Sequence, residues 1–242
     1  MNILFVNHYC GFQGGVERNV FDTALGLKRR GHSCYLLARE TARDAVTFGN
    51  AFDDSMLMSG DPSTCNSSRQ ALHDFVENTN PDIIYVHKWT PVECLEPFAG
   101  RYRMIRMFHD HDAYCPRSHK YYSLSHRLCD KPMGWNCYRD FGFIHRDRGS
   151  VFGIGITDIR LMQQRLALHH TLFDRLLVAS QYMADQLMIN GLPGEIINCI
   201  PLGIPIAEED SIPDEIPKEP RILLVGQLVR GKGVHLMIES LE

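Results

Sequence analysis

The fold is decided by residues 2–38, which read NILFVNHYCGFQGGVERNVFDTALGLKRRGHSCYLLA. Residues 3–6 are a short apolar run, and a glycine-bearing loop separates them from an amphipathic stretch at residues 16–30. Gly31 is placed to end the helix predicted there, and residues 34–38 supply a second apolar run. The segment predicts one strand–helix–strand unit, and such units favour a parallel sheet.

The same alternation continues along the chain at a regular spacing. Further helices are predicted at residues 70–78, 92–98, 158–173 and 181–190, and further strands at residues 83–87, 104–108, 176–179 and 196–200. Alternating strands and helices of this length are typical of an open, doubly wound parallel α/β sheet of the Rossmann-like kind.

Two segments interrupt this pattern. Residues 109–150 are rich in His, Cys, Arg, Tyr and Gly without a sustained apolar period, which predicts a long loop or insertion. Residues 201–220 are rich in Pro and acidic residues, which predicts an interdomain linker. A new strand at 221–225, a glycine-bearing loop and a helix at 234–242 then follow. We therefore expect one domain at 1–200 and the beginning of another at 221–242.

Composition limits the classes of function that the chain can have. Of its 242 residues, 44% are hydrophobic and 22% are charged, which is ordinary for a globular protein with a core. A net charge of -4 gives no general attraction to nucleic acid. No uncharged apolar run is long enough to span a bilayer, and the N-terminus lacks the features of a signal peptide. We expect a cytoplasmic protein whose eight cysteines stay reduced.

Polar residues follow the predicted strand at 104–108. Ligands of open α/β sheets bind outside the carboxyl ends of the strands, so His109 and Asp110 stand where chemistry is expected. The alternative is that His109 caps a helix or lies in an ordinary loop. His87 ends another predicted strand, and we interpret it as a buried strand-end residue rather than a catalytic one.

The first loop carries Gly14 and Gly15, followed by Glu17. Glycines let a ligand approach the backbone closely, and the amides at the start of the next helix can hold a phosphate or sugar oxygen. A plain tight turn is the alternative interpretation.

The order of these motifs resembles the retaining glycosyltransferases of family 4, which have two facing Rossmann-like domains. The resemblance implies that this chain is the N-terminal, acceptor-side domain of such a fold, and that the loop of Gly14, Gly15 and Glu17 faces the cleft. It also implies that His109 hydrogen-bonds the transferred sugar near the reacting carbon and that Asp110 orients the sugar or the acceptor.

The resemblance extends to residues 224–233, where the family's donor-binding domain begins. Lys232 matches a lysine that neutralises the pyrophosphate of the sugar nucleotide. Gln227 stands where an arginine is usual, and Arg230 is a candidate to replace it. Two glutamates expected further downstream are absent from the sequence. We therefore expect a truncated form that is inactive alone.

The resemblance predicts transfer of a sugar from a nucleotide diphosphate sugar to a glycan or lipid-linked acceptor, with retention. The nucleotide sugar is a substrate, and no cofactor and no nucleic acid partner are expected. A lipid-linked acceptor would imply peripheral membrane contact by the full-length enzyme. The alternative is a non-catalytic α/β module that binds a nucleotide or sugar. A Rossmann oxidoreductase is disfavoured, because no Gly-x-Gly-x-x-Gly follows the first strand.

The insertion contains Cys115, Cys129 and Cys137 among several histidines. Zinc is held by four such ligands, but the three cysteines are separated by thirteen and seven residues without a Cys-x-x-Cys pair. We favour loop thiols, or a pair that oxidises, over a metal site. The basic and aromatic side chains of this loop would equally suit an anionic or carbohydrate acceptor.

Overall fold

A computed structural model describes residues 1–89, 91–122, 127–146, 153–203, 221–226, 228 and 232–241. The chain divides into two units, Met1–Leu202 and Gly203–Glu242, which are described separately. The functional boundaries predicted at residues 200 and 220 stay predictions.

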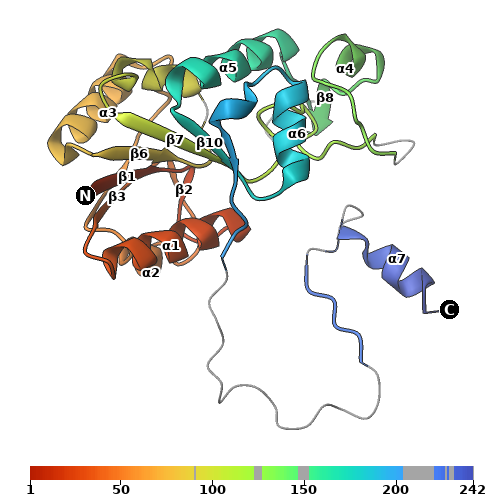
Figure 1. The fold of residues 1–242 in the computed structure, drawn as a ribbon, viewed down its shortest axis with the longest axis horizontal. Helices are drawn as coiled ribbons and strands as arrows, with labels where there is room; N and C mark the ends of the chain where they lie inside the picture. Colours follow the sequence, from red (N-terminus) through yellow and green to blue (C-terminus); the bar gives the residue numbers. More distant parts are fainter. Residues whose placement is uncertain are drawn as a thin grey trace. The chain divides into compact units, whose positions relative to one another are not determined.

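The first unit is built on a parallel sheet (Figure 1). Its strand order is β11-β10-β7-β6-β1-β3-β5, and every neighbouring pair runs parallel. The strands are β1 (Asn2–Val6), β3 (Ser33–Ala38), β5 (Asp54–Leu57), β6 (Ile83–Val86), β7 (Arg103–Phe108), β10 (Arg175–Val178) and β11 (Ile197–Cys199). The prediction of an open, doubly wound parallel sheet is confirmed.

Helices cover both faces of this sheet (Figure 1). On one face α1 (Gly15–Lys28) and α2 (Ala45–Gly49) close a core around Phe5, Leu36 and Phe48. The other core includes Leu4 and Ile84, together with side chains of α3 (Asn66–Thr79), the 3-10 helix η1 (Val92–Phe98), α5 (Ile159–Leu172) and α6 (Gln181–Ile189). Burial on both faces explains why the central strands read as continuous apolar runs. None of the described helices is both long and apolar enough to cross a membrane.

Strand β1 lies at the point where the direction of winding reverses. Leu4 pairs with Tyr35 of β3 on one side and with Ile84 of β6 on the other. The chain first proceeds outward from β1 through β3 to β5, and then returns to the opposite side of β1 as β6. In such sheets a crevice forms between the loops that leave the two strands in opposite directions. The carboxyl ends of β1 and β6 are therefore the expected ligand position.

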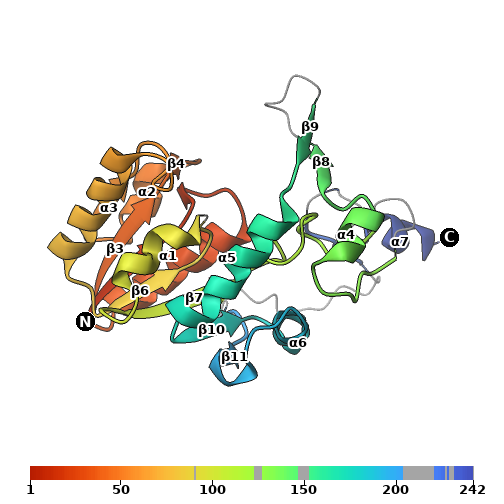
Figure 2. The same cartoon turned by 90° about the horizontal axis from the view of Figure 1, so that it is seen from above.

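The insertion at 109–150 is more regular than predicted. It contains α4 (Trp135–Arg139) and β8 (Ile144–Arg146), and β8 pairs antiparallel with β9 (Ile154–Ile156). Figure 2 shows this hairpin extending away from the sheet. Elements of three to five residues are too short to show a hydrophobic period, so a pattern search misses them. The same reason explains the missed pair β2 (Tyr9–Cys10) and β4 (Glu40–Thr41).

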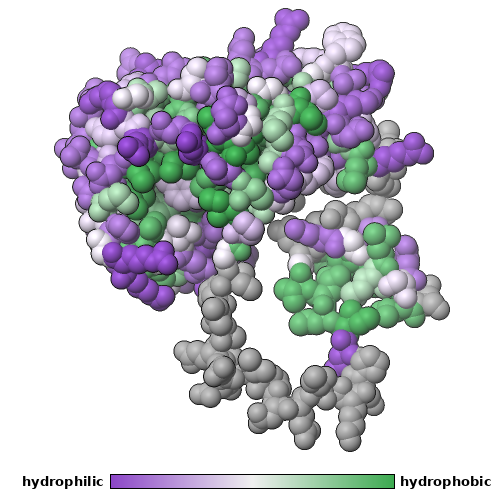
Figure 3. Space-filling view, viewed as in Figure 1, coloured by the Kyte–Doolittle hydropathy of each residue, from purple (hydrophilic) through white to green (hydrophobic). Residues whose placement is uncertain are grey.

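In the second unit, α7 (Val234–Glu239) forms where a helix was predicted. The strand predicted at 221–225 is wrong, because these residues pair with no other strand in the described part of the chain. A β-strand is stabilised by its ladder to a neighbour, and an apolar run without one stays extended and exposed. Leu223 is 87% exposed and Val225 86%, and Figure 3 shows the hydrophobic colour of this unit.

Candidate functional site

The carboxyl ends of three adjacent strands bring polar residues together. Asn7 follows β1, His87 follows β6 and His109 follows β7. The backbone N–H of His87 donates to the carbonyl of Val6 over 2.8 Å, which continues the β1–β6 ladder beyond the last strand residue. The polar side chains are therefore fixed by the sheet rather than by a free loop.

His87 and His109 form a hydrogen-bonded pair. Nδ1 of His87 lies 2.9 Å from Nε2 of His109, and the two rings stack with their centroids 5.2 Å apart. His87 is only 1% exposed, and its other face stacks on Phe5 of β1. The prediction that His87 is a buried strand-end residue fits this environment. Its contact with His109 could not be read from the sequence.

Burial keeps both imidazoles neutral. It lowers the pKa of His109 to about 4; the negative charge of Asp110 opposes this shift, and the positive charges of Lys88 and Arg106 add to it. The pKa of His87 is lowered well below its usual range, again chiefly by burial. At neutral pH the pair therefore offers hydrogen bonds and no positive charge.

We expect His109 to remain neutral from pH 8 down to pH 5. Because protonation is disfavoured in the folded state, the contribution of His109 to stability should be lost as the pH falls from about 6.5 towards 4. Long-range ¹H–¹⁵N NMR of the ring nitrogens measures the titration directly. A midpoint near 6.5 would show that the imidazole is solvated and would contradict this description.

Lys88 lies between two carboxylates beside this pair. Its Nζ is 2.8 Å from Oδ2 of Asp110 and 3.7 Å from Oδ2 of Asp112. Although burial opposes the charge, Asp110, Asp112 and Glu17 raise the pKa of Lys88. Burial also opposes ionisation of Asp110, but hydrogen bonds from Asp112 and Lys88 lower its pKa. Burial and the neighbouring Asp110 raise the pKa of Asp112 to about 6. Asp110 is therefore the more acidic carboxylate of the cluster, and Asp112 takes up a proton first as the pH falls.

Asn7 holds the backbone that carries Lys88. The Asn7 side chain is fully buried; its Oδ1 accepts from the Lys88 N–H over 3.3 Å, and its Nδ2 donates to the Tyr9 carbonyl over 2.9 Å. Sequence reasoning missed Asn7, Lys88 and Asp112. Asn7 and Lys88 directly follow predicted strands, and Asp112 lies two residues after Asp110, so their position at strand ends is the signal that identifies them.

The glycine loop that was predicted to face a ligand has space beside it. A Cβ on Gly14 would meet nothing nearer than an oxygen of Glu17 at 3.9 Å, and a Cβ on Gly15 would meet nothing within 4 Å. Gly14 also has extended backbone, which any residue can adopt. Neither backbone strain nor internal packing therefore requires these glycines. Gly14 is also the N-cap of α1, a position where glycine is favoured, and the approach of a ligand to this loop stays a prediction.

Glu17 has a structural role that the sequence did not reveal. It is 3% exposed, and its Oε2 accepts the N–H of Gly14 over 2.9 Å at the beginning of α1. A carboxylate three residues after the N-cap stabilises a helix start in this way. Its predicted role in donor or acceptor binding stays a prediction.

The remaining predicted site residues are only partly within the described structure. Arg230 and Gln227 lie outside the described residues, and Lys232 belongs to the second unit. Cys115 is buried, Cys129 and Cys137 are half-buried, and all three are free thiols. The described residues contain no group of three or more His, Cys, Asp or Glu side chains arranged to hold a metal ion.

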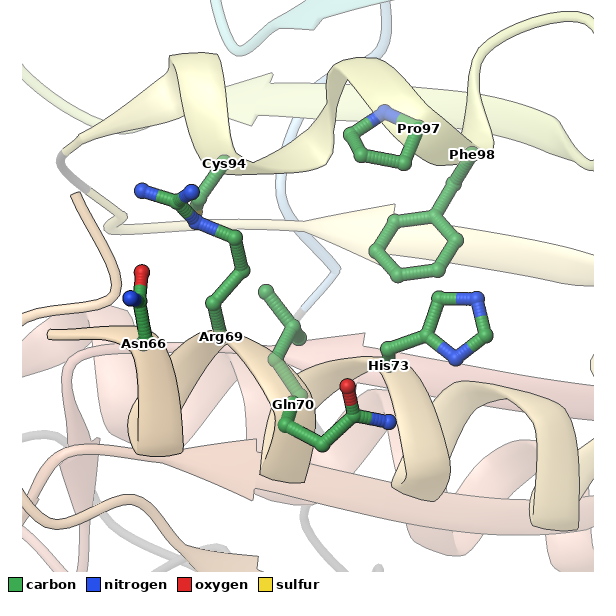
Figure 4. Close-up of a pocket in the computed structure, with 8 residues that line it drawn as sticks. Asn66, Arg69, Gln70, His73, Cys94, Pro97 and Phe98 are labelled. Atoms are coloured by element: carbon green, nitrogen blue, oxygen red, sulfur yellow. The ribbon is translucent and has the colours of Figure 1, made fainter.

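A separate hollow of about 290 Å³ lies between α3 and η1 (Figure 4). Two of its polar side chains already have partners. Arg69 donates to the carbonyls of Pro62 and Ser63, and Gln70 donates to Asp74. The hollow shares no residue with the cluster at the strand ends.

The family model described as Glycosyltransferase Family 4 matches residues 13–151 of this chain. The chain belongs to glycosyltransferase family 4. The matched range includes the glycine loop, His87 to Asp112, and the cysteines of the insertion. The family resemblance of the motifs is confirmed, and every residue of the cluster at the strand ends except Asn7 lies within the matched range.

Solved structures share this fold at low sequence identity. Anabaena Alr3699/HepE in complex with UDP has a TM-score of 0.51 and 15% identity over 84% of this chain and 44% of its own. The same protein in complex with UDP-glucose has a TM-score of 0.51 and 13% identity over 84% of this chain and 44% of its own. A glycosyltransferase from Rickettsia africae has a TM-score of 0.48 and 13% identity over 82% of this chain and 42% of its own. This family 4 chain thus spans less than half the length of these proteins. A search of curated proteins gives no match.

Proposed function

We propose that this protein contributes the acceptor-side domain of a retaining glycosyltransferase, which moves a sugar from a nucleoside diphosphate sugar to a glycan or lipid-linked acceptor. The observation that carries the proposal is the neutral His109 beside the ionised Asp110 in the segment that matches family 4. Both lie at the carboxyl edge of the sheet, beside the reversal of winding.

The hydrogen bond between the histidines assigns a proton to each ring. Nε2 of His87 is buried without a partner among the described residues. An unpaired buried N–H is rarer than an unpaired acceptor, so Nδ1 of His87 carries the proton and donates to Nε2 of His109. His109 then carries its own proton on Nδ1, where it is available to a hydroxyl of the sugar.

A neutral donor suits the chemistry of glycosyl transfer. Positive charge develops on the sugar ring as the bond to the diphosphate breaks, and an imidazolium beside the ring would oppose it. A neutral imidazole orients a sugar hydroxyl without that penalty. Asp110, held by Lys88, accepts from a second hydroxyl of the sugar or of the acceptor.

The negative charge that develops on the departing diphosphate requires cations and amide donors. We propose that Lys232 and Arg230 supply the cations and that the amides beside Gly14 and Gly15 face the donor. UDP-sugars are the first donors to test, because the Anabaena protein with this fold was solved with UDP and with UDP-glucose.

The test uses the protein as its gene encodes it, incubated with UDP-, GDP- and ADP-sugars and with glycan or lipid-linked acceptors. We expect release of the nucleoside diphosphate to depend on the acceptor, and ¹H NMR of the product to show the anomeric configuration of the donor. Inverted product would disprove retention. Calorimetric binding of a donor with no transfer to any acceptor would instead establish a binding module.

A further inference from the structure

A second, smaller pocket of about 100 Å³ lies between η1 and α5, on the face of the sheet that these two helices cover. Trp89, Arg106, Arg165 and His169 line it, together with Asp112 at the edge of the cluster described above. Two of these side chains, Arg106 and His169, are at least nine-tenths buried and keep a nitrogen without a partner among the described residues.

Nε2 of His169 is a buried acceptor that has no donor among the described residues. Its Nδ1 lies 2.8 Å from the carbonyl oxygen of Arg165 and 3.1 Å from that of Leu166. Carbonyl oxygens only accept, so Nδ1 carries the ring proton and Nε2 is an acceptor. The side chain is 2% exposed and Nε2 has no described donor.

Arg106 provides a buried N–H donor to complement this acceptor. It is 4% exposed within strand β7, and its Nη1 donates to the Trp89 carbonyl over 3.3 Å. Its Nε–H has no described acceptor. The guanidinium and the His169 ring both lie against Phe108, with centroid distances of 5.1 Å and 5.4 Å. One buried donor and one buried acceptor thus line the same pocket.

We propose that this pocket binds the hydroxyl-bearing end of a neutral ligand such as a polyol or sugar. A hydroxyl group accepts from the Nε–H of Arg106 and donates to Nε2 of His169, which satisfies both nitrogens. An anion without a proton satisfies Arg106 and leaves His169 without a donor. A metal cation is repelled by Arg106, and an apolar group leaves both nitrogens unpaired, at a cost for each.

Charge in the pocket wall is largely balanced and does not select an anion. Glu93 already holds Arg165 in a two-pronged ion pair at 2.6–3.1 Å, so Arg165 adds little free positive charge. Asp112 brings a carboxyl group to the same wall. The hollow in Figure 4 is larger, but two of its polar side chains are engaged, and it lacks this pattern of unpaired buried atoms among the described residues.

The volume limits what enters. At about 100 Å³ the pocket is smaller than the hollow of about 290 Å³ between α3 and η1, and it suits a small hydroxyl-bearing group such as a hydroxymethyl or a diol. The site depends on Arg106 and His169 alone and would exist whether or not the protein transfers sugars.

Trp89 allows a direct test, because the chain has two tryptophans and Trp135 is 80% exposed. In a Trp135→Phe background, Trp89 is the sole reporter of the pocket. We expect glycerol to change its emission saturably and to shift the ¹⁵N resonance of His169 Nε2. His169→Phe should weaken glycerol binding at least tenfold, whereas the matched variant His170→Phe, at an exposed position, should leave it unchanged. Circular dichroism establishes that both variants fold.

Three results would overturn the proposal. A linear change with glycerol, equal in His169→Phe, would reduce the effect to one of bulk solvent. Saturable binding of sulfate in preference to glycerol would make the pocket an anion site. No response of either the Trp89 emission or the His169 Nε2 resonance to glycerol would show that the pocket does not take up a polyol.

Discussion

Replacing His109 with alanine is expected to lower the turnover number of the proposed sugar transfer about a hundredfold, measured on the protein as its gene encodes it, while the affinity for the donor changes little. The hydrogen bond from His109 to the sugar should matter most in the transition state, where charge and geometry are most demanding. Steady-state kinetics with a saturating acceptor measures both quantities. The matched control is His170→Ala, which removes an exposed histidine from α5.

The secondary structure should persist in His109→Ala, but the structure predicts a stability cost. The change leaves the buried Nδ1 of His87 without its partner, at roughly 1–3 kcal/mol. Urea unfolding should show this loss and circular dichroism an unchanged fold. Turnover near that of the unaltered enzyme would make His109 a loop histidine and remove the basis of the mechanism.

Replacing His87 with leucine is expected to lower the turnover number about tenfold, because the donor that fixes the His109 tautomer is removed. His87 acts through His109 and is a positioning residue. The decisive readout is NMR of His109, whose ring should change from a single tautomer, protonated on Nδ1, to a mixture. A merely structural defect would not move that signal.

A conservative variant makes the second prediction sharper. The amide of asparagine places an N–H donor close to the position of Nδ1, so His87→Asn should restore part of the turnover and the single tautomer of His109. Equal turnover in His87→Leu and His87→Asn, with the tautomer of His109 unchanged in both, would show that His87 only fills space beside Phe5.

The sheet was predictable because its central strands are buried on both faces and separated by helices. The elements that the sequence did not predict are exposed or short. Strand β5 (Asp54–Leu57) lies at the edge of the sheet with most of its residues exposed, so no apolar run marks it. The insertion's helix and hairpin are too short for a period to emerge.

The candidate site was predictable only in part. His109 and Asp110 follow from the rule that ligands meet the carboxyl ends of strands. Their pairing with His87 and Lys88 depends on the register of β6 against β7, in which Val86 lies opposite Arg106. A single sequence does not contain that register. Arg106 did carry a signal, since a charged residue interrupts the apolar run of a central strand.

The strand order also bears on how the protein is made. Strand β1 is synthesised before both of its neighbours in the sheet, and Ile3 meets its β6 partner Ile83 only after eighty further residues have been added. Until then one long side of β1 is an unpaired, apolar edge of the kind that joins other chains. Contacts this distant along the chain slow folding. During synthesis of residues 34–86 the nascent chain is therefore exposed to aggregation along this side of β1.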